Sequence, residues 1–235
     1  MKRYHWFGFL PFYLLAVIVF VGIAQIGSDS VTAIKQNAPV ERRYCFVIDA
    51  GHGGVDGGAT SCTGILESTL NLEIALKLND LMRFLGFDTV MTRTTDTSIH
   101  TKGQTIAAQK VSDLKERVRI VNETENAILI SIHQNTFSDS RYGGAQVFYG
   151  ANGDSRQLAE LLQNALAQTV NSGSNRKCKT SKGIYLMEHI DQTGVLIECG
   201  FLSNPQEEAK LRDDAYQKQL CCVIASTVSS YVSNT

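Results

Sequence analysis

Short apolar runs alternate with longer stretches of helical periodicity along most of this chain, and that alternation constrains the fold more than any other feature. The strand-like runs lie at 44–48, 87–94, 127–133, 145–149 and 194–197. The helical stretches lie at 66–85, 114–121, 154–169 and 213–231, with a further helix start at 204–205. Strands that alternate with helices predict a single α/β domain, whose twisted and mostly parallel sheet carries helices on both faces.

Two polar stretches are expected to be irregular. Residues 95–111 lack a periodic apolar stripe and are predicted to form a surface loop. The helix that follows would then begin with Ser112 or Asp113 as its N-cap. Residues 171–182 are polar and basic and are predicted to form a second loop.

The first 27 residues have the pattern of a targeting segment. Lys2 and Arg3 precede an uncharged run at 6–26, which is long enough to span a bilayer as a helix. The positive-inside rule places the amino terminus in the cytoplasm and the rest of the chain outside the membrane. An uncleaved membrane anchor and a signal peptide cleaved after Ala24 both remain open. Residues 28–42 are expected to be a linker, and residues 43–235 the folded domain.

Charge and cysteine usage exclude two kinds of binding site. The net charge of −1 provides no basic surface for a polyanion, so nucleic acid is excluded as a partner. None of the six cysteines belongs to a CxxC pair, which argues against a cysteine-ligated metal. The cysteines are expected to be mostly free and buried, with at most one disulfide.

Three of the apolar runs are followed at once by a residue suited to metal or acid–base chemistry, namely His52, His133 and Glu198. Ligands of open α/β sheets gather outside the carboxyl ends of the strands. Glu67 begins the first long helix, and its position directs it back toward the same edge. Two imidazoles and one carboxylate are a common catalytic zinc set. A further carboxylate at Glu198 would then carry the proton.

Spacing alone leaves ordinary structural interpretations open for each of these residues. A histidine at a strand end is often a hydrogen-bonded core residue. Glu67 would also be favoured by the dipole at a helix N-terminus, and Glu198 would also be accommodated by pairing with an arginine.

Six sequence motifs favour the functional interpretation of these residues over the structural ones. They are VIDAGHGG at 47–54, DGGA at 56–59, GILE at 64–67, TRTTD at 92–96, SIHQN at 131–135 and LIECGFLSNP at 196–205. Together they resemble the zinc-dependent N-acetylmuramoyl-L-alanine amidases of the amidase-3 family, over residues 44–232. The resemblance makes residues 43–235 the amidase catalytic domain.

The resemblance also implies roles for individual residues. His52, Glu67 and His133 match the family's zinc ligands, and Glu198 matches its catalytic glutamate. The family hydrolyses the amide between N-acetylmuramic acid and L-alanine in peptidoglycan. Asn135 is a candidate for orienting a ligand or substrate, or for stabilising a turn. Arg93 is a candidate for contacting a peptide carboxylate, with a structural ion pair to Asp96 or a neighbour as the favoured alternative.

The single-domain layout is most similar to the germination-specific amidases of the spore cortex. That similarity implies a part in forming muramic-δ-lactam, alongside a separate peptidoglycan deacetylase, and action outside the cytoplasmic membrane. An activating protein partner is a further expectation. Two other functions remain open from the sequence: a non-catalytic peptidoglycan-binding module, and a zinc peptidase that cleaves within stem peptides.

Overall fold

The structure is a computed structural model that describes residues 44–171 and 174–234. The predicted targeting segment at 1–27 and linker at 28–42 lie outside the described residues. Within the described part of the chain, no helix combines the length and the apolar character needed to cross a bilayer.

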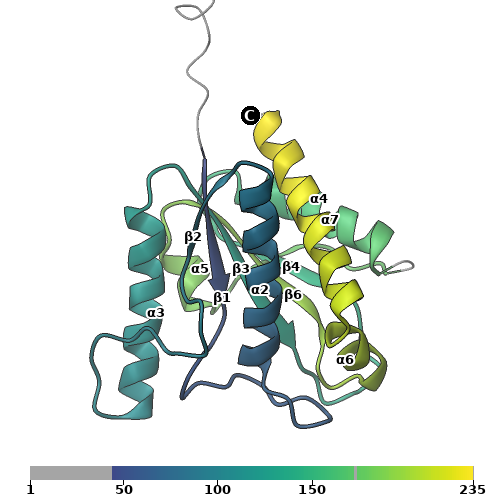
Figure 1. The fold of residues 1–235 in the computed structure, drawn as a ribbon, viewed down its shortest axis with the longest axis horizontal. Helices are drawn as coiled ribbons and strands as arrows, with labels where there is room; N and C mark the ends of the chain where they lie inside the picture. Colours follow the sequence, from purple (N-terminus) through teal and green to yellow (C-terminus); the bar gives the residue numbers. More distant parts are fainter. Residues whose placement is uncertain (1–43, 172–173, 235) are drawn as a thin grey trace, which may run out of the picture. The chain divides into compact units, whose positions relative to one another are not determined.

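The described residues form one six-stranded sheet with the strand order β2-β1-β3-β6-β4-β5 (Figure 1). The strands are β1 (Cys45–Ala50), β2 (Asp88–Met91), β3 (Ala127–Asn135), β4 (Gln146–Tyr149), β5 (Lys179–Thr180) and β6 (Thr193–Phe201). Neighbouring strands run parallel except β4 and β6, which are antiparallel. The prediction of a mostly parallel sheet is confirmed, and the sheet is mixed at this one pairing.

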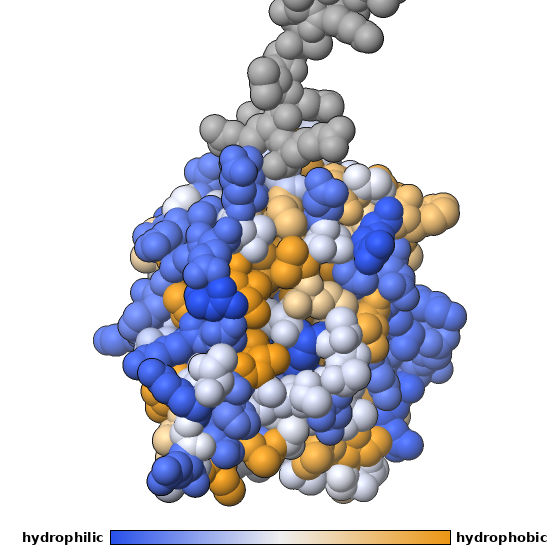
Figure 2. All heavy atoms as spheres, turned by 60° about the vertical axis from the view of Figure 1, so that its left-hand side comes forward, coloured by the Kyte–Doolittle hydropathy of each residue, from blue (hydrophilic) through white to orange (hydrophobic). Residues whose placement is uncertain are grey.

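Helices cover both faces of the sheet, as predicted. On one face, α2 (Glu67–Phe84) and α4 (Ser155–Thr169) both pack against α7 (Asp214–Ser233). On the other face, α3 (Ile106–Glu123) packs against α5 (Tyr185–His189). The short helix α6 (Pro205–Leu211) contacts β6 and α7. Figure 2 turns the side of the molecule with α3 forward, and hydrophilic residues cover much of it with apolar residues grouped between them.

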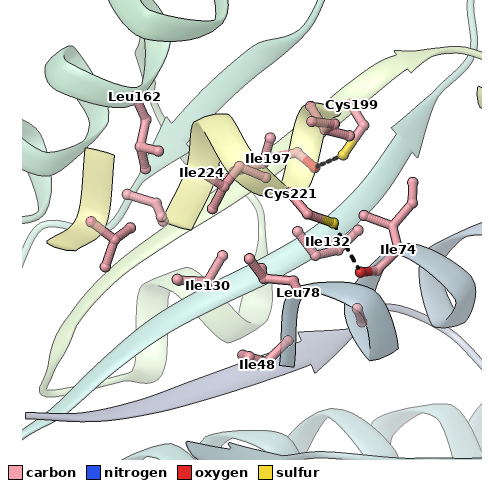
Figure 3. Close-up of a cluster of buried hydrophobic side chains, with 14 of the residues drawn as sticks. Ile48, Ile74, Leu78, Ile130, Ile132, Leu162, Ile197, Cys199, Cys221 and Ile224 are labelled. Carbon is pink, nitrogen blue, oxygen red and sulfur yellow. Dashed lines mark hydrogen bonds between the residues drawn. The ribbon is translucent and has the colours of Figure 1, made fainter. Parts of the chain in front are cut away.

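The main core lies between the sheet and the layer of α2, α4 and α7 (Figure 3). Its labelled apolar side chains are Ile48, Ile74, Leu78, Ile130, Ile132, Leu162, Ile197 and Ile224. A smaller cluster on the opposite face includes Val47 and Leu129 of the strands and Leu186 of α5. Side chains on both faces of β1 and β3 are therefore buried, which is why the sequences of these strands are continuous apolar runs.

The six cysteines are free. Cys199 and Cys221 lie in the main core, where their thiols donate to the carbonyls of Ile197 and Ile74 (Figure 3). Cys45 and Cys178 are half-buried, and Cys62 and Cys222 are exposed. Only two of the six cysteines are therefore buried, and the expectation that most of them are buried is wrong.

The start of α3 corrects a second prediction. The helix begins at Ile106, and the Thr105 side chain caps it by accepting from the backbone N–H of Ala108. The first turns of α3 are largely exposed, so they lack the apolar stripe that would reveal a helix in the sequence. Ser112 and Asp113, the predicted caps, instead accept hydrogen bonds from the backbone of residues 99–102.

The parallel direction of β1, β3 and β6 brings their carboxyl ends to one edge of the sheet. In Figure 1 this is the lower edge, where the loop after β1 leads into the start of α2. Ala50 pairs with Ile132, and His133 pairs with Glu198. The residues that follow these strands therefore meet at a single place.

Candidate metal centre

The carboxylate of Glu67 lies between two histidine rings. Its Oε2 is 3.2 Å from Nε2 of His52, and its Oε1 is 2.9 Å from Nδ1 of His133. One ligand atom from each of the three residues lies within 4.8 Å of the other two. Burial raises the pKa of Glu67, but the hydrogen bonds and charges of the two histidines outweigh it and hold that pKa well below its usual range.

His52 sits on the loop after β1 in a left-handed backbone conformation, with φ of 61°. Its Nδ1–H donates to Oδ2 of Asp56 at 3.0 Å, which leaves Nε2 directed toward Glu67. Lys110 lies 2.9 Å from the other oxygen of Asp56. Burial lowers the pKa of His52, but Glu67 and Asp56 outweigh it and raise that pKa. Such a carboxylate fixes the ring orientation and tautomer of a metal-binding histidine.

Glu67 is itself held by groups from three parts of the chain. The backbone N–H of Ala59 donates to its Oε2, and the backbone N–H of Gln134 donates to its Oε1. Asn71, one turn further along α2, also donates to Oε1 at 3.2 Å. The amide oxygen of Asn71 accepts from the buried side chain of Gln134. These contacts fix the carboxylate before any ligand binds.

Two glycines make room for the histidine rings and the carboxylate. A Cβ atom at Gly51 would lie 2.2 Å from Nε2 of His133. A Cβ atom at Gly58, where φ is +68°, would lie 2.6 Å from Oε2 of Glu67 and 2.7 Å from Cδ2 of His52. Any larger residue at these two positions would displace the three side chains.

Glu198 lies on β6 directly opposite His133 of β3. Its Oε2 is buried and has no hydrogen-bond partner among the described residues. Burial is the largest cause that raises the pKa of Glu198 to about 7, with the His133 charge opposing it and the Glu67 carboxylate adding to it. A carboxyl group that can take up or release a proton near neutral pH therefore adjoins the three-residue cluster.

The donor set and the space fit a metal ion. Two imidazole nitrogens and one carboxylate oxygen converge without a side chain between them, and His52 and His133 stay partly exposed. The orphaned Oε2 of Glu198 marks a polar position beside them. Three ligands that leave one side open are the arrangement of catalytic rather than structural metal sites.

Arg93 is buried beneath the loop that carries His52. Its guanidinium donates to the carbonyls of Ala50, Gly51, Ser68 and Thr95. Arg93 therefore binds the backbone directly before His52 and directly after Glu67.

Asn135 ends β3, two residues beyond His133. Its side-chain oxygen accepts from the backbone N–H of Thr136, and its carbonyl accepts from Leu202. These contacts hold the turn that follows the strand. Neither Asn135 nor Arg93 belongs to the cluster of three ligand atoms.

Sequence reasoning assigned no role to Asp56, Asn71 or Arg117, although each supports the cluster. Arg117 of α3 pairs with Asp49 and Asp113 and donates to the carbonyls of Ala50 and His52. Two signals were available in the sequence. Asp56 follows His52 by four residues, and Asn71 is a polar residue on the apolar face of its helix, one turn after Glu67.

A mostly parallel α/β domain that gathers two histidines and two carboxylates at the carboxyl edge of its sheet has the features of a metal-dependent hydrolase. Residues 46–230 match the family described as N-acetylmuramoyl-L-alanine amidase. The chain belongs to this family, and its activity is that of an N-acetylmuramoyl-L-alanine amidase, a hydrolase of peptidoglycan.

Individual relatives agree with this assignment. The chain is 32% identical over 232 residues to the germination-specific N-acetylmuramoyl-L-alanine amidase of Bacillus subtilis, covering 98% of this chain and 95% of that protein. The structure resembles the CwlD amidase from Clostridioides difficile in complex with the GerS lipoprotein, with a TM-score of 0.78 and 35% identity over 82% of this chain and 100% of that one. It also resembles the catalytic domain of the amidase CwlV from Bacillus (Paenibacillus) polymyxa, with a TM-score of 0.69 and 27% identity over 82% of this chain and 99% of that one.

Proposed function

We propose that the chain hydrolyses the muramoyl–L-alanine amide with zinc held by His52, Glu67 and His133, and with Glu198 as the proton carrier. The observation that carries this proposal is the Glu67 carboxylate between the two imidazoles, with Glu198 paired to His133 on the next strand. Mixed nitrogen and oxygen ligands in this number suit zinc. Zinc bound there would polarise a carbonyl and acidify a water molecule.

Glu198 performs the proton transfers in this proposal. Its Oε2 takes a proton from the attacking water and passes it to the nitrogen of L-alanine as the amide breaks. A pKa raised to about 7 by burial suits a group that must both accept and donate at neutral pH. The partly exposed histidines leave the cluster accessible to a bulky polymer substrate.

Mass spectrometry of peptidoglycan digested by the full chain tests the reaction. Free stem peptides that begin with L-alanine, together with glycan strands that carry intact lactyl groups, are the expected products. Shortened stems still attached to the glycan would identify a peptidase instead. Bound but chemically unchanged peptidoglycan would identify a binding module.

The requirement for zinc is tested by removing the metal and then adding it back. Chelation should abolish release of stem peptides, and stoichiometric zinc should restore it. Calcium and magnesium prefer sites built from oxygen ligands and should not restore it. Restoration by magnesium alone would overturn the zinc assignment.

The biological role that we propose is modification of the spore cortex. The support is the similarity to the germination-specific amidase, which extends over nearly the whole of both chains. In this role, removal of stem peptides precedes the action of a deacetylase, and the two steps produce muramic-δ-lactam. Spores that lack this chain should contain no muramic-δ-lactam in their cortex muropeptides. Normal lactam content would contradict the role.

We also infer that a protein partner activates the enzyme. The related CwlD amidase has been determined in complex with the GerS lipoprotein, and the domain described here resembles it throughout. Zinc content and turnover of the full chain purified alone give the test. Full zinc occupancy and full activity without any partner would exclude a required activator.

Residues 1–27 are proposed to export the chain and to anchor it or be removed. Peptidoglycan lies outside the cytoplasmic membrane, so a cell-wall amidase acts there. Lys2 and Arg3 before an uncharged run supply the signal. Amino-terminal sequencing of the mature protein, together with membrane fractionation, distinguishes the anchor from a cleaved signal. A mature protein found in the cytoplasm would contradict both.

A further inference from the structure

Three aromatic side chains gather where β3 and β6 end, the two strands that carry His133 and Glu198. The rings of Phe137 and Tyr142 are 4.6 Å apart, and the rings of Tyr142 and Phe201 are 6.5 Å apart. Phe137 is 50% exposed and Tyr142 is 48% exposed, while Phe201 is buried beneath them. We call this group the aromatic shelf.

The aromatic shelf continues the two strands that carry the site. Asn135 pairs with Phe201, just beyond the pairing of His133 with Glu198. Phe137 follows His133 by four residues, which is at most about 13 Å of extended chain. A substrate bound at the metal centre therefore has the aromatic shelf within one or two sugar units.

The loop of the aromatic shelf is fixed at several points. Phe137 donates its backbone N–H to Oγ of Ser203, and Asn204 donates to the carbonyl of Tyr142. The backbone N–H of Gly144 donates to Glu207 at 2.6 Å. The two rings thus stay half-exposed on a loop that is tied down, rather than folding into the core. Exposed apolar groups held in this way mark binding surfaces.

The two arginine side chains beside the aromatic shelf already have hydrogen-bond partners, and Arg141 is ion-paired. Arg141 forms hydrogen bonds with Asp139. Arg176 donates to the carbonyl of Gly143 and lies 4.9 Å above the Phe201 ring. A stem peptide carries free carboxylates, which call for available cationic partners. The uncharged face of a sugar ring presents only C–H groups, which pack on an aromatic face.

We propose that Phe137 and Tyr142 form a carbohydrate subsite that holds a sugar ring of the glycan strand next to the scissile amide. This proposal deepens the amidase function and rests on it. The sugar lies against the two exposed rings, and the stem peptide extends away from them. The subsite selects glycan-linked stems over free peptides and over muramoyl peptides that lack a neighbouring sugar.

The test compares two substrates and two isolated ligands. The substrates are a tetrasaccharide of alternating N-acetylglucosamine and N-acetylmuramic acid with stem peptides, and a single N-acetylmuramoyl peptide. The ligands are the same tetrasaccharide without peptides and the free stem peptide, with binding to the full chain measured by calorimetry. Phe137→Ala should raise KM for the tetrasaccharide substrate and weaken tetrasaccharide binding by about tenfold, the value expected for loss of one aromatic contact. Free stem peptide should bind as before.

Two further variants keep the test interpretable if Phe137→Ala lowers stability. Phe137→Tyr keeps the ring and should retain binding. Phe84→Ala is the matched control, because Phe84 is 86% exposed at the far end of α2, about 26 Å of helix from Glu67. This control should bind every ligand as the parent does.

Two results would overturn the subsite. Weaker binding of the free stem peptide in Phe137→Ala would make the aromatic shelf a peptide site. Unchanged KM for both substrates, together with unchanged binding of both ligands, would show that the aromatic shelf has no role in recognition. Failure of the amidase function is distinguishable, because the parent chain would then release no stem peptides while calorimetry with the peptide-free tetrasaccharide still reports on the shelf.

Discussion

Nη2 of Arg117 lies 2.8 Å from the carbonyl oxygen of His52 and donates a hydrogen bond to it. The same buried guanidinium is ion-paired with Asp49 and Asp113. His52 has a left-handed backbone, which an L-residue adopts only when its surroundings impose it. Arg117 and Asp56 therefore hold His52 from two sides, Arg117 through its backbone and Asp56 through its ring.

The first prediction concerns this positioning role. Arg117→Lys keeps the charge but loses the planar fork that reaches Asp49, Asp113 and the His52 carbonyl together. Zinc affinity should fall by roughly tenfold or more, the usual effect of losing a group that orients a metal ligand. Competition with a chelating dye on the folded protein measures this.

Arg119→Lys provides the matched control for Arg117→Lys. Arg119 lies on the same helix but is exposed, and it pairs with Glu116 and Glu123. Equal zinc affinity in both variants would show that Arg117 supports only the fold.

The second prediction concerns Asp49, whose carboxylate is buried against Arg117, Ser131 and Thr92. Burial raises its pKa, but these partners outweigh burial and lower the pKa to about 2. Asp49→Asn leaves the Arg117 charge buried without its main partner, so the free energy of unfolding should fall by about 3–5 kcal/mol at pH 7.

The pH dependence of this effect has a definite sign. The folded pKa of Asp49 is below the unfolded value, so its ionisation stabilises the fold above about pH 4. That contribution, about 2 kcal/mol, should disappear as the pH falls from about 4 to about 2. Urea unfolding of the parent and Asp49→Asn at pH 7, 4 and 3 tests it. If the difference in free energy of unfolding between the two proteins stayed constant or widened toward pH 3, the lowered pKa of Asp49 would be contradicted.

Much of the fold could be predicted because a strand that is buried on both faces of the sheet has a continuous apolar sequence. The continuous apolar runs of β1, β3 and β6 identified three central strands, and the residues after them identified the edge that carries the site. The direction of β4 could not be predicted, since four residues carry no information about which way a strand runs. The start of α3 was missed because its first turns bury too little to be periodic.

The candidate site was likewise predictable only in part. His52, Glu67 and His133 were identified from motifs, and the structure brings them together. Arg117 donates to the carbonyl of His52 across 65 residues of sequence. Asp56 and Asn71 instead lie only four residues from the side chains that they contact. Neither periodicity nor spacing encodes the Arg117 contact, whereas the four-residue spacings of Asp56 and Asn71 are visible in the sequence.

The third prediction separates proton transfer from metal binding. Glu198→Gln keeps the shape of the side chain but cannot accept a proton, so kcat should fall by about 100-fold or more. Zinc content should be unchanged, because Glu198 lies outside the three-residue cluster. Glu160→Gln, at an exposed position of α4, is the control and should retain activity. Loss of zinc from Glu198→Gln would instead make Glu198 a ligand.

The final prediction compares two positions that require glycine for different structural reasons. At Gly51 a Cβ atom would strike the His133 ring at 2.2 Å, whereas at Gly86, where φ is +88°, it would meet nothing within 4 Å. Gly51→Ala should therefore lose zinc binding and activity, because the ring must move. Gly86→Ala should cost only about 1 kcal/mol of stability from its backbone conformation and keep full zinc affinity. Thermal unfolding and zinc titration of both variants measure this, and normal zinc affinity in Gly51→Ala would show that the His133 ring does not need the space above Gly51.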